Sequence, residues 1–464
     1  MLDRINAVIL AAGKGTRLKI DTAKPLCPAL GKCLVDYVVE GLTRFGQDLD
    51  LNFVVGHQRE LVESHLLRQF SQMKFNFAHQ QEQLGTGHAV QVFFEKFPLA
   101  WENKYTLIVC ADTPLITSEV YQRLYEELID NNYDAVCASF IAQRPFGYGR
   151  INHGEVGFDI VEEKDASQEQ RKITEVNSGL YLFKTSHIKK YLNDLDDNNQ
   201  SGEFYLTDLL KKDLNVKAIK FEQEIDFLGV NNLVQLEMAE KVLAQRKKEK
   251  LMLAGVRMIN ADSIYIEDQV EIEPGSVLHP NVQLFGHTKI AAEVEIEAGC
   301  ILKNSVIGAG SQIKAYSYLE GTQVRKNASI GPMARLREGT IISDNCRVGN
   351  FVETKKTLLH DGVKVSHLSY VGDAEIGENT NIGCGFITCN YDGANKHKTT
   401  IGKDSFVGSD CQMIAPVEIG DEAYIGSGST INKNVPSGAF AIARQRQVTK
   451  ENMAHKFIKK KDKI

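Results

Sequence analysis

Aliphatic residues recur at every sixth position through long stretches of the second half of this chain. A helix repeats its apolar residues about every 3.6 positions and a strand every 2, so neither element explains this spacing. A strand that turns a corner every sixth residue does explain it, because each turn stacks its aliphatic side chain on the turn below. The repeated positions are Ile266, Ile272, Leu278, Leu284, Ile290, Ile296 and Leu302, then Val324, Ile330, Leu336, Ile342 and Val348, then Ile401, Val407, Met413, Ile419, Ile425 and Ile431.

Many apolar residues of this region are followed at once by glycine, which is typical of hexapeptide repeats. The pairs are Ile330-Gly331, Val348-Gly349, Val371-Gly372, Ile376-Gly377, Ile382-Gly383, Ile401-Gly402, Val407-Gly408, Ile419-Gly420 and Ile425-Gly426. We therefore predict that residues from about 255 to 440 coil into a β-helix. The alternative, an ordinary β-sandwich, would show alternating apolar residues and unevenly spaced turns.

Length, charge and cysteine content restrict the remaining possibilities. A chain of 464 residues holds more than one hydrophobic core, and its net charge of −6 provides no overall basic field for nucleic acid. The basic segment 455–461 is local, and it is either a frayed end or an anion-binding tail.

The sequence also favours a cytoplasmic protein. No apolar stretch reaches the roughly 18 residues of a membrane span, and the short N-terminal apolar run passes straight into glycine and charge, unlike a signal peptide. Nine cysteines without a CxxC spacing favour reduced thiols. We expect Cys384 and Cys389, within the repeats, to be packing residues rather than zinc ligands.

A predicted phosphate-binding loop follows the first apolar run. The segment 6–12 is apolar throughout after Asn6, as in a buried parallel strand, and it leads into Gly13-Lys14-Gly15-Thr16-Arg17 and then Lys24-Pro25. Glycines directly after a strand let backbone N–H groups approach phosphate oxygens, and the cations balance their charge. A plain turn is the alternative, but the strand before it and the cations after it favour a nucleotide site.

Further strands are expected at 51–55, 106–111 and 135–140, with helical segments between them, which indicates an α/β sheet. Ligands of such sheets lie at the carboxyl ends of the strands, and Asp112 follows the run 107–111 at that position. A carboxylate there can hold Mg²⁺ against a triphosphate. The alternative role for Asp112 is a loop or helix-capping aspartate.

Several motifs of the first 232 residues resemble the sugar-1-phosphate nucleotidyltransferases. They are residues 10–17 with Lys24, residues 83–88, residues 147–151, Glu162 in 160–166, Asn177 in 177–179 and Asn231 in 229–232. Together with the β-helix, the chain resembles the bacterial bifunctional family of N-acetylglucosamine-1-phosphate uridylyltransferase and glucosamine-1-phosphate N-acetyltransferase. The family makes UDP-N-acetylglucosamine, a precursor of peptidoglycan and lipopolysaccharide.

The resemblance implies three segments. These are a Rossmann-like α/β nucleotidyltransferase domain at 1–230, a linker helix at 231–254, and a left-handed parallel β-helix of hexapeptide repeats with a C-terminal tail at 255–464. In the first domain the resemblance implies that Mg²⁺ and UTP bind, with Lys24 and Arg17 balancing charge during attack on the α-phosphorus. The implied ligand contacts are Leu10, Ala11, Ala12, Gly13, Gln80, Gly85 and Thr86 for the nucleotide, Gly149, Glu162 and Asn177 for the sugar, and Asp112 and Asn231 for the metal.

The repeats contain a polar insertion at 389–398 and a second polar cluster around His367. Imidazole is suited to remove a proton from an attacking amine near neutral pH, whereas a lone histidine in a solenoid is more often structural. Resemblance of residues 353–356, 370–377 and 390–398 to the family's acetyltransferase domain favours His367 as the general base. It also implies a homotrimer that binds the sugar phosphate through Arg337, Lys355, Tyr370 and Asn381, and acetyl-CoA through Cys384, Asn390, Tyr391, Ser409, Ser427 and Arg444.

Residues 231–254 carry apolar side chains at helical spacing, with Asn231 or Asn232 able to cap the helix. We expect the charge run 246–250 to be a solvated face of this helix.

Two other functions stay open. Cys110-Ala111 stands where the family usually has Tyr-Gly, and the segment Pro25–Pro28 also differs, which motivates a nucleotidyltransferase for another sugar or base. Alternatively, the β-helix is a non-catalytic scaffold or sensor.

Overall fold

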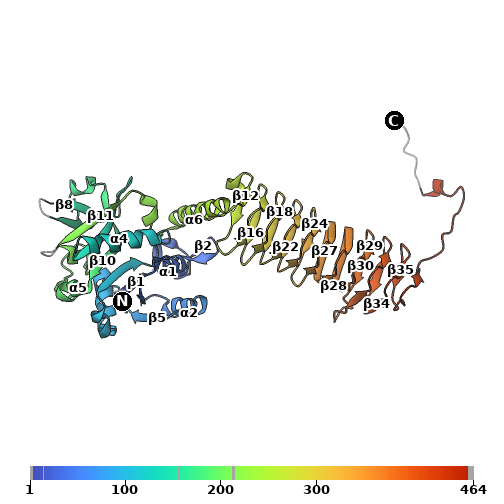
Figure 1. Cartoon of the computed structure of the whole chain (residues 1–464), viewed down its shortest axis with the longest axis horizontal. Coiled ribbons are helices and arrows are strands. Elements are labelled where there is room, and N and C mark those ends of the chain that lie inside the picture. The colour runs from blue at the N-terminus through green and yellow to red at the C-terminus, as the bar shows by residue number, and fades with distance from the viewer. Residues whose placement is uncertain (1–3, 14, 155–156, 212–214, 458–464) are drawn as a thin grey trace, which may run out of the picture. The chain divides into compact units, whose positions relative to one another are not determined.

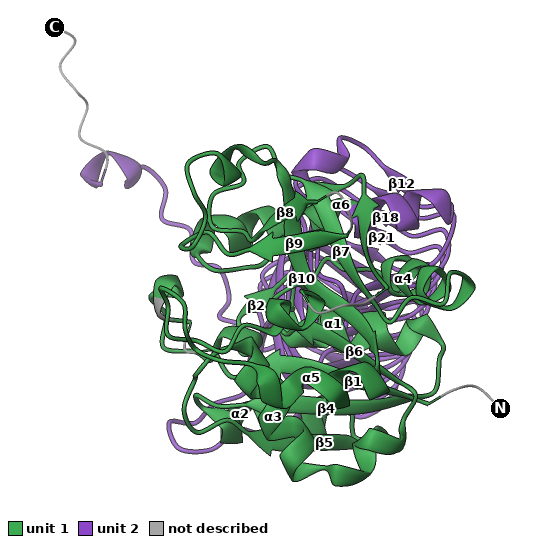
Figure 2. Cartoon of the chain, turned by 90° about the vertical axis from the view of Figure 1, so that its left-hand side faces the viewer, with its two compact units in different colours: residues 1–245 green, residues 246–464 purple. Residues whose placement is uncertain are grey.

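The structure of the protein, a computed structural model, describes residues 4–13, 15–154, 157–211 and 215–457. The chain divides into two compact units, residues 1–245 and 246–464, shown in separate colours in Figure 2. The first unit mixes helices with a central sheet, and the second is a coil of short strands (Figure 1).

The first unit is built on a mixed sheet that has nine strands in the described residues, ordered β11-β7-β10-β6-β1-β4-β5, with the hairpin β8–β9 attached to β10. The strands predicted at 51–55, 106–111 and 135–140 are confirmed to within two residues at each end. Strand β10 runs antiparallel to both β6 and β7, a reversal that no local pattern predicted. The strands are β1 (Ile5–Ala11), β4 (Leu49–Val55), β5 (Phe75–His79), β6 (Tyr105–Cys110), β7 (Ala135–Ile141), β8 (Arg150–His153), β9 (Phe158–Val161), β10 (Glu175–Lys184) and β11 (Val216–Phe221).

Helices cover both faces of this sheet, because successive strand residues point to opposite sides. On β1, Ile5, Ala7 and Ile9 pack in one core with α1, α2 and α4, whereas Val8 packs in a second core with α3 and α5. The predicted Rossmann-like α/β domain is therefore confirmed. The helices are α1 (Leu34–Phe45), α2 (Arg59–Gln69), α3 (Thr86–Lys96), α4 (Ser118–Asp130) and α5 (Thr185–Tyr191).

Helix α6 (Leu233–Leu253) contains the point at which the two units divide, between residues 245 and 246. Asn232 caps it, since its side-chain oxygen accepts the Gln235 N–H at 2.9 Å. Asn231, the other candidate cap, accepts a hydrogen bond from Lys24 instead. No helix of the described residues is long and apolar enough to cross a membrane.

The expectation that residues 246–250 form a solvated face is wrong for two lysines. Lys247 Nζ donates to the carbonyl oxygens of Asp268 and Val270 at 2.7 and 2.8 Å, and Lys248 Nζ donates to that of Ala261 at 2.8 Å. Lys248 is only 7% exposed. Their ammonium groups therefore satisfy backbone carbonyls at the start of the β-helix.

The second unit runs from β12 (Arg257–Met258) to β37 (Phe440–Ala441), and most strands pair in parallel with the third strand after them. Tyr265 lies beside Gln283, 18 positions further on, and three strands therefore complete one coil. Every aliphatic residue of the six-residue repeat is buried, with none more than 8% exposed. The predicted left-handed parallel β-helix is confirmed.

Two interruptions of the repeat have local causes. After Leu302 the buried series continues at Ile307, one residue early, and Asn304 between them turns the chain with a φ of 47°. Further along, Asn381 pairs with Phe406, 25 positions away, because residues 390–398 leave the coil as a loop.

The loop 390–398 is held by its own hydrogen bonds. Asp392 accepts the backbone N–H groups of Ala394 and Asn395 at 2.8 and 2.7 Å, and its other oxygen lies 2.7 Å from His397 Nε2. These contacts lower the pKa of Asp392 well below its usual range.

Adjacent residues of β20 (Val306–Ile307) test whether stacking of the aliphatic side chains stabilises the coil. Ile307 is fully buried, whereas Val306 is 45% exposed. We expect Ile307→Ala to lower the free energy of unfolding of the β-helix by about 2–5 kcal/mol, and Val306→Ala by less than about 0.5 kcal/mol. Urea denaturation followed by circular dichroism measures both, and equal losses would show that the stacking is not the main source of stability.

Candidate active sites

A cavity of about 300 Å³ opens at the carboxyl ends of β1 and β6. Its walls bring together segments that lie far apart in the sequence, as expected for an α/β sheet. Nine of the residues predicted to contact the nucleotide or metal line it: Leu10, Ala11, Ala12, Gly13, Lys24, Gln80, Gly85, Thr86 and Asp112.

Gly85 has to be glycine for the backbone to close one wall of this cavity. Its φ is +112°, and a Cβ there would lie 2.6 Å from the carbonyl oxygen of Phe204. The same oxygen accepts the Gly87 N–H at 2.8 Å, at the start of α3. Glu203, beside Phe204, also lines the cavity, although no sequence motif pointed to it.

One cationic side chain occupies the centre of the site. Lys24 Nζ donates to the Asp112 carboxylate and to Asn231 Oδ1, the latter at 2.8 Å. These three residues come from segments far apart in the sequence. Gly15 leaves room for the Lys24 side chain, because a Cβ at position 15 would lie only 3.0 Å from the Lys24 Cβ. The Asp112 carboxylate oxygen and the Asn231 amide oxygen both contact the Lys24 ammonium. Together they form a set of oxygen donors suited to a hard metal ion such as Mg²⁺.

The residues predicted to contact the sugar lie together outside this cavity. The Asn177 N–H donates to the Gly149 carbonyl at 2.8 Å, and a Cβ on Gly149 would lie 3.3 Å from Glu162 Oε1. Glu162 lines a second cavity of about 520 Å³, and burial raises the pKa of its carboxyl group. Arg17 is exposed on a short 3₁₀ turn and does not line either cavity, while Lys14 lies outside the described residues.

Cys110 lines the cavity at the carboxyl ends of β1 and β6, and the neighbouring Ala111 N–H donates to the Leu10 carbonyl at 3.0 Å. Burial raises the pKa of the Cys110 thiol to about 12. The thiol is therefore protonated near neutral pH and acts as a small apolar wall of the cavity.

The second site lies on two long adjacent strands of the β-helix, β27 (Arg347–Leu359) and β28 (Lys364–Ile376). His367 is exposed and pairs in register with Asn350, whose Oδ1 lies 3.3 Å from the His367 Nδ1. When Nδ1 donates its hydrogen to that oxygen, Nε2 keeps a free lone pair. Tyr370 follows on the same strand, opposite Glu353.

A cluster of cations surrounds Lys355. The neighbouring ammonium of Lys396, and then the guanidinium of Arg337, lower the pKa of Lys355. Arg337 donates through Nη1 to Glu353 at 2.8 Å. No sequence motif singled out Lys396 itself, although the polar insertion that carries it is evident in the sequence.

The residues predicted to bind acetyl-CoA follow successive coils of the β-helix. Asp410 N–H donates to the Cys384 carbonyl at 2.7 Å, and Gly428 N–H donates to the Ser409 carbonyl at 2.8 Å. A Cβ on Gly428 would lie 3.8 Å from Arg444 Cδ. The exposed residues Cys384, Ser409, Ser427 and Arg444 are therefore aligned from coil to coil.

The expectation that Cys384 is a packing residue is wrong, because it is exposed; Cys389 is half-buried. Cys384 lies in the turn that follows the strand Asn381–Ile382, where its side chain is exposed instead of packed in the core. Asn390 is 6% exposed and donates to Asp373 Oδ2 at 2.5 Å, whereas Tyr391 is 59% exposed. Asn381 is half-buried on β29 (Asn381–Ile382), beside Lys364 of β28.

Comparison with known proteins supports the two-domain organisation independently of the structure. Family profiles match residues 7–194 as a MobA-like NTP transferase domain, 260–344 as a GMPPB C-terminal domain, and 398–433 as six bacterial transferase hexapeptide repeats. The bifunctional protein GlmU of Pelobacter propionicus is 40% identical over 99% of this chain and 100% of its own length. The proteins of the same name from Caldanaerobacter subterraneus subsp. tengcongensis and Staphylococcus haemolyticus are 43% and 42% identical, over 99% and 97% of this chain and 99% of their own lengths.

This chain belongs to the bifunctional GlmU family. Its membership confirms the family recognised from the sequence and the expected combination of a nucleotidyltransferase domain with a hexapeptide-repeat transferase domain. The match extends over nearly the whole chain, so it includes both candidate sites.

The cation cluster should bind a phosphate monoester. We expect Lys396→Ala to weaken binding of glucosamine-1-phosphate at least about tenfold, because a charge-assisted hydrogen bond to an anion is lost. Lys398→Ala is the matched control, since Lys398 pairs with Glu375 at 2.6 Å. Isothermal titration measures both, and equal affinities in the two variants would contradict the assignment.

Proposed function

We propose that this chain catalyses two consecutive reactions of UDP-N-acetylglucosamine synthesis. The β-helix transfers the acetyl group of acetyl-CoA to glucosamine-1-phosphate. The α/β unit then transfers UMP from UTP to N-acetylglucosamine-1-phosphate and releases pyrophosphate. One observation carries the proposal: a single chain of this family contains both candidate sites. The first is a lysine–carboxylate centre at a cavity where strands end, and the second is a histidine on the pair of strands that also bears the cation cluster.

In the nucleotidyl transfer, a phosphate oxygen of the sugar forms a bond to the α-phosphorus of UTP, and the bond to the β-phosphate breaks. No protein nucleophile is needed, because positioning and charge neutralisation supply most of the catalysis. The segment Leu10–Gly13, with Gln80, Gly85 and Thr86, would hold the nucleoside. Lys24 and Arg17 would balance the triphosphate, and Gly149, Glu162 and Asn177 would contact the sugar.

Asp112 and Asn231 would hold Mg²⁺, whose charge would neutralise the phosphate oxygens when it is bound. Lys24 already contacts both oxygens. The lysine would therefore lie beside the metal and the phosphates in the loaded site.

In the acetyl transfer, the amine nitrogen of glucosamine-1-phosphate attacks the thioester carbonyl carbon. A C–N bond forms, the C–S bond breaks, and His367 accepts the proton lost by the amine while CoA leaves and becomes protonated. Arg337 and Lys355 would bind the sugar phosphate, with Lys396 beside them, and Tyr370 and Asn381 would position the sugar. Cys384, Asn390, Tyr391, Ser409, Ser427 and Arg444 would contact acetyl-CoA.

We also propose that the chain is a cytoplasmic homotrimer whose acetyltransferase sites lie between subunits. Support comes from the hexapeptide repeats and from the loop 390–398, which leaves the regular coil. Light scattering should give about three times the 51.7 kDa mass of one chain. A monomeric mass would contradict the shared site.

One coupled assay tests the function as a whole. The pure protein is incubated with glucosamine-1-phosphate, acetyl-CoA, UTP and Mg²⁺, and both free thiol and pyrophosphate are measured. Release of both supports the proposal, and release of neither would refute it.

A second function is favoured by one observation, the presence of Cys110 and the buried Ala111 ahead of the metal aspartate. A β-carbon at position 111 reshapes the wall that faces sugar or nucleotide. A panel of nucleoside triphosphates and hexose phosphates distinguishes the two functions, because dominance of dTTP or glucose-1-phosphate would support the second.

Asp112→Asn should reduce pyrophosphate release at least about a hundredfold, because the carboxylate charge toward Mg²⁺ and Lys24 is lost. Acetyl transfer should be unchanged. Asp159→Asn, at an exposed position of β9, is the control. Steady-state rates measure both variants, and an active Asp112→Asn enzyme would rule out this metal ligand.

His367→Ala should lower acetyl transfer by about 10²–10⁴-fold while uridylyl transfer stays nearly intact. The control is His360→Ala, because His360 lies on the same unit but pairs with Glu375 at 2.9 Å. Unchanged acetyl transfer in His367→Ala would indicate another base. A wild-type protein without acetyl transfer would instead favour the scaffold role of the β-helix.

A further inference from the structure

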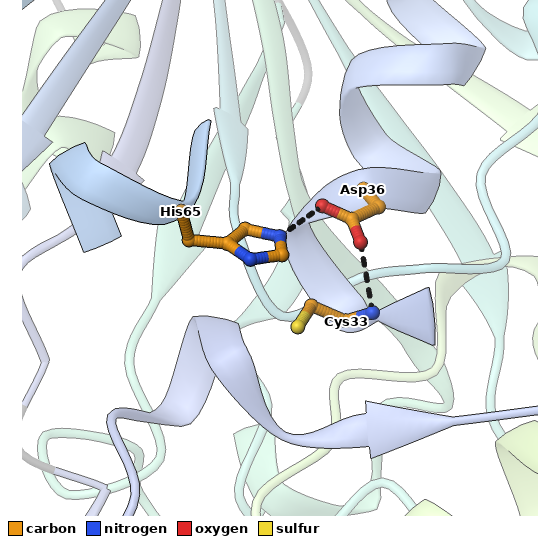
Figure 3. Close-up of side chains that lie close together, drawn as sticks. All are labelled: Cys33, Asp36 and His65. Atoms are coloured by element: carbon orange, nitrogen blue, oxygen red, sulfur yellow. Dashed lines mark hydrogen bonds and ion pairs between the residues drawn. The ribbon is translucent and has the colours of Figure 1, made fainter. Parts of the chain in front are cut away.

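Three side chains of different chemistry converge in the first unit, on helices that neither proposed reaction uses. Cys33 is the last residue of β3 (Lys32–Cys33) and the N-cap of α1, Asp36 lies in the first turn of α1, and His65 comes from the middle of α2 (Figure 3). Their ligand atoms, a thiol sulfur, a carboxylate oxygen and an imidazole nitrogen, all lie within 4.8 Å of one another.

The hydrogen bonds of the cluster orient the carboxylate. Asp36 Oδ2 accepts the Cys33 backbone N–H at 2.9 Å, and Asp36 Oδ1 lies 2.7 Å from His65 Nε2. The Asp36 side chain is 2% exposed and that of His65 is 15% exposed. A buried carboxylate of this kind requires a positive partner, which is either a proton on His65 or a metal ion.

We propose that Cys33, Asp36 and His65 form a binding site for a thiophilic divalent cation of the Zn²⁺ class, with water as the fourth ligand. Thiolate, imidazole and carboxylate together are zinc ligands, whereas Mg²⁺ and Ca²⁺ prefer oxygen alone. The site is distinct from the oxygen-lined centre at Asp112, since none of its three residues lines that cavity.

The existing geometry needs only a small adjustment. Zinc bonds of about 2.0–2.3 Å in a tetrahedral arrangement separate the ligand atoms by roughly 3.3–3.8 Å. The nitrogen and oxygen that now share a 2.7 Å hydrogen bond must therefore move apart by roughly 0.6–0.8 Å, and the His65 side chain is the more exposed of the two. The ion would then replace the shared proton.

Bound metal would tie α2 to the start of α1. The short hairpin of β2 (Pro28–Ala29) and β3 connects that start to the turn that carries Lys24, and the Cys27 carbonyl accepts the Leu34 N–H at 3.0 Å. The cation would thus stabilise the segment between the catalytic lysine and α1.

The test uses the full-length chain, without an affinity tag, stripped with a chelator and held in excess Mg²⁺ to occupy oxygen-only sites. Zn²⁺ alone is titrated against a competing chromogenic chelator. We expect one high-affinity Zn²⁺ per chain, and at least tenfold weaker binding in Cys33→Ser and His65→Gln. His57→Gln, at an exposed histidine of the same unit, should bind as the wild type does.

Co²⁺ gives a second readout that does not depend on enzyme activity. Wild type and His57→Gln should show the near-ultraviolet sulfur-to-cobalt band, and Cys33→Ser should lack it. Serine is a good N-cap, so this variant should keep the fold, which circular dichroism checks. Equal Zn²⁺ affinity in wild type and Cys33→Ser, or a cobalt band that survives in Cys33→Ser, would overturn the proposal.

Discussion

Burial of one aliphatic side chain in each six-residue segment is the constraint on which the second unit depends. Each buried residue holds a short strand against the coils above and below, and the backbone hydrogen bonds of one coil are completed by its neighbours. If one coil slid by a single residue along its neighbour, its buried aliphatic side chains would move to the outer face. The register between coils is therefore uniquely determined. Asn350, His367, Glu353 and Tyr370 hold their mutual positions for this reason.

The two units carry different arrangements of charge at their candidate sites. In the α/β unit, glycines bring the backbone close to the cavity, and one lysine lies between a carboxylate and an amide oxygen. Such a centre is close to charge balance, because one ammonium lies between one carboxylate and a neutral amide. In the β-helix, Arg337, Lys355 and Lys396 repel one another enough to lower the pKa of Lys355, and a bound phosphate would relieve that repulsion.

Family membership accounts for the two-domain organisation, whereas the surroundings of individual cysteines have to be read from the structure of this chain. Cys110 is half-buried in the cavity wall and its thiol is protonated near neutral pH, so it acts by shape rather than by reactivity. Cys33 is different, because an imidazole and a carboxylate lie within reach of its sulfur. Neither distinction follows from counting cysteines, since all nine are free thiols.

Periodicity and short motifs determined much of this protein from sequence alone. The six-residue repeat predicted the β-helix, the apolar runs predicted β1, β4, β6 and β7, and the motifs predicted nine residues that line the cavity at the ends of β1 and β6. Those features are local, because one strand or one turn suffices to produce each pattern. Only the tertiary structure could reverse β10, bury Lys248 against backbone carbonyls, or expose Cys384 at the surface of its coil. Only the folded chain places Lys396 beside Lys355, and Cys33 and Asp36 beside His65. Such contacts join separate elements, and the number of residues between two elements does not determine their distance in space.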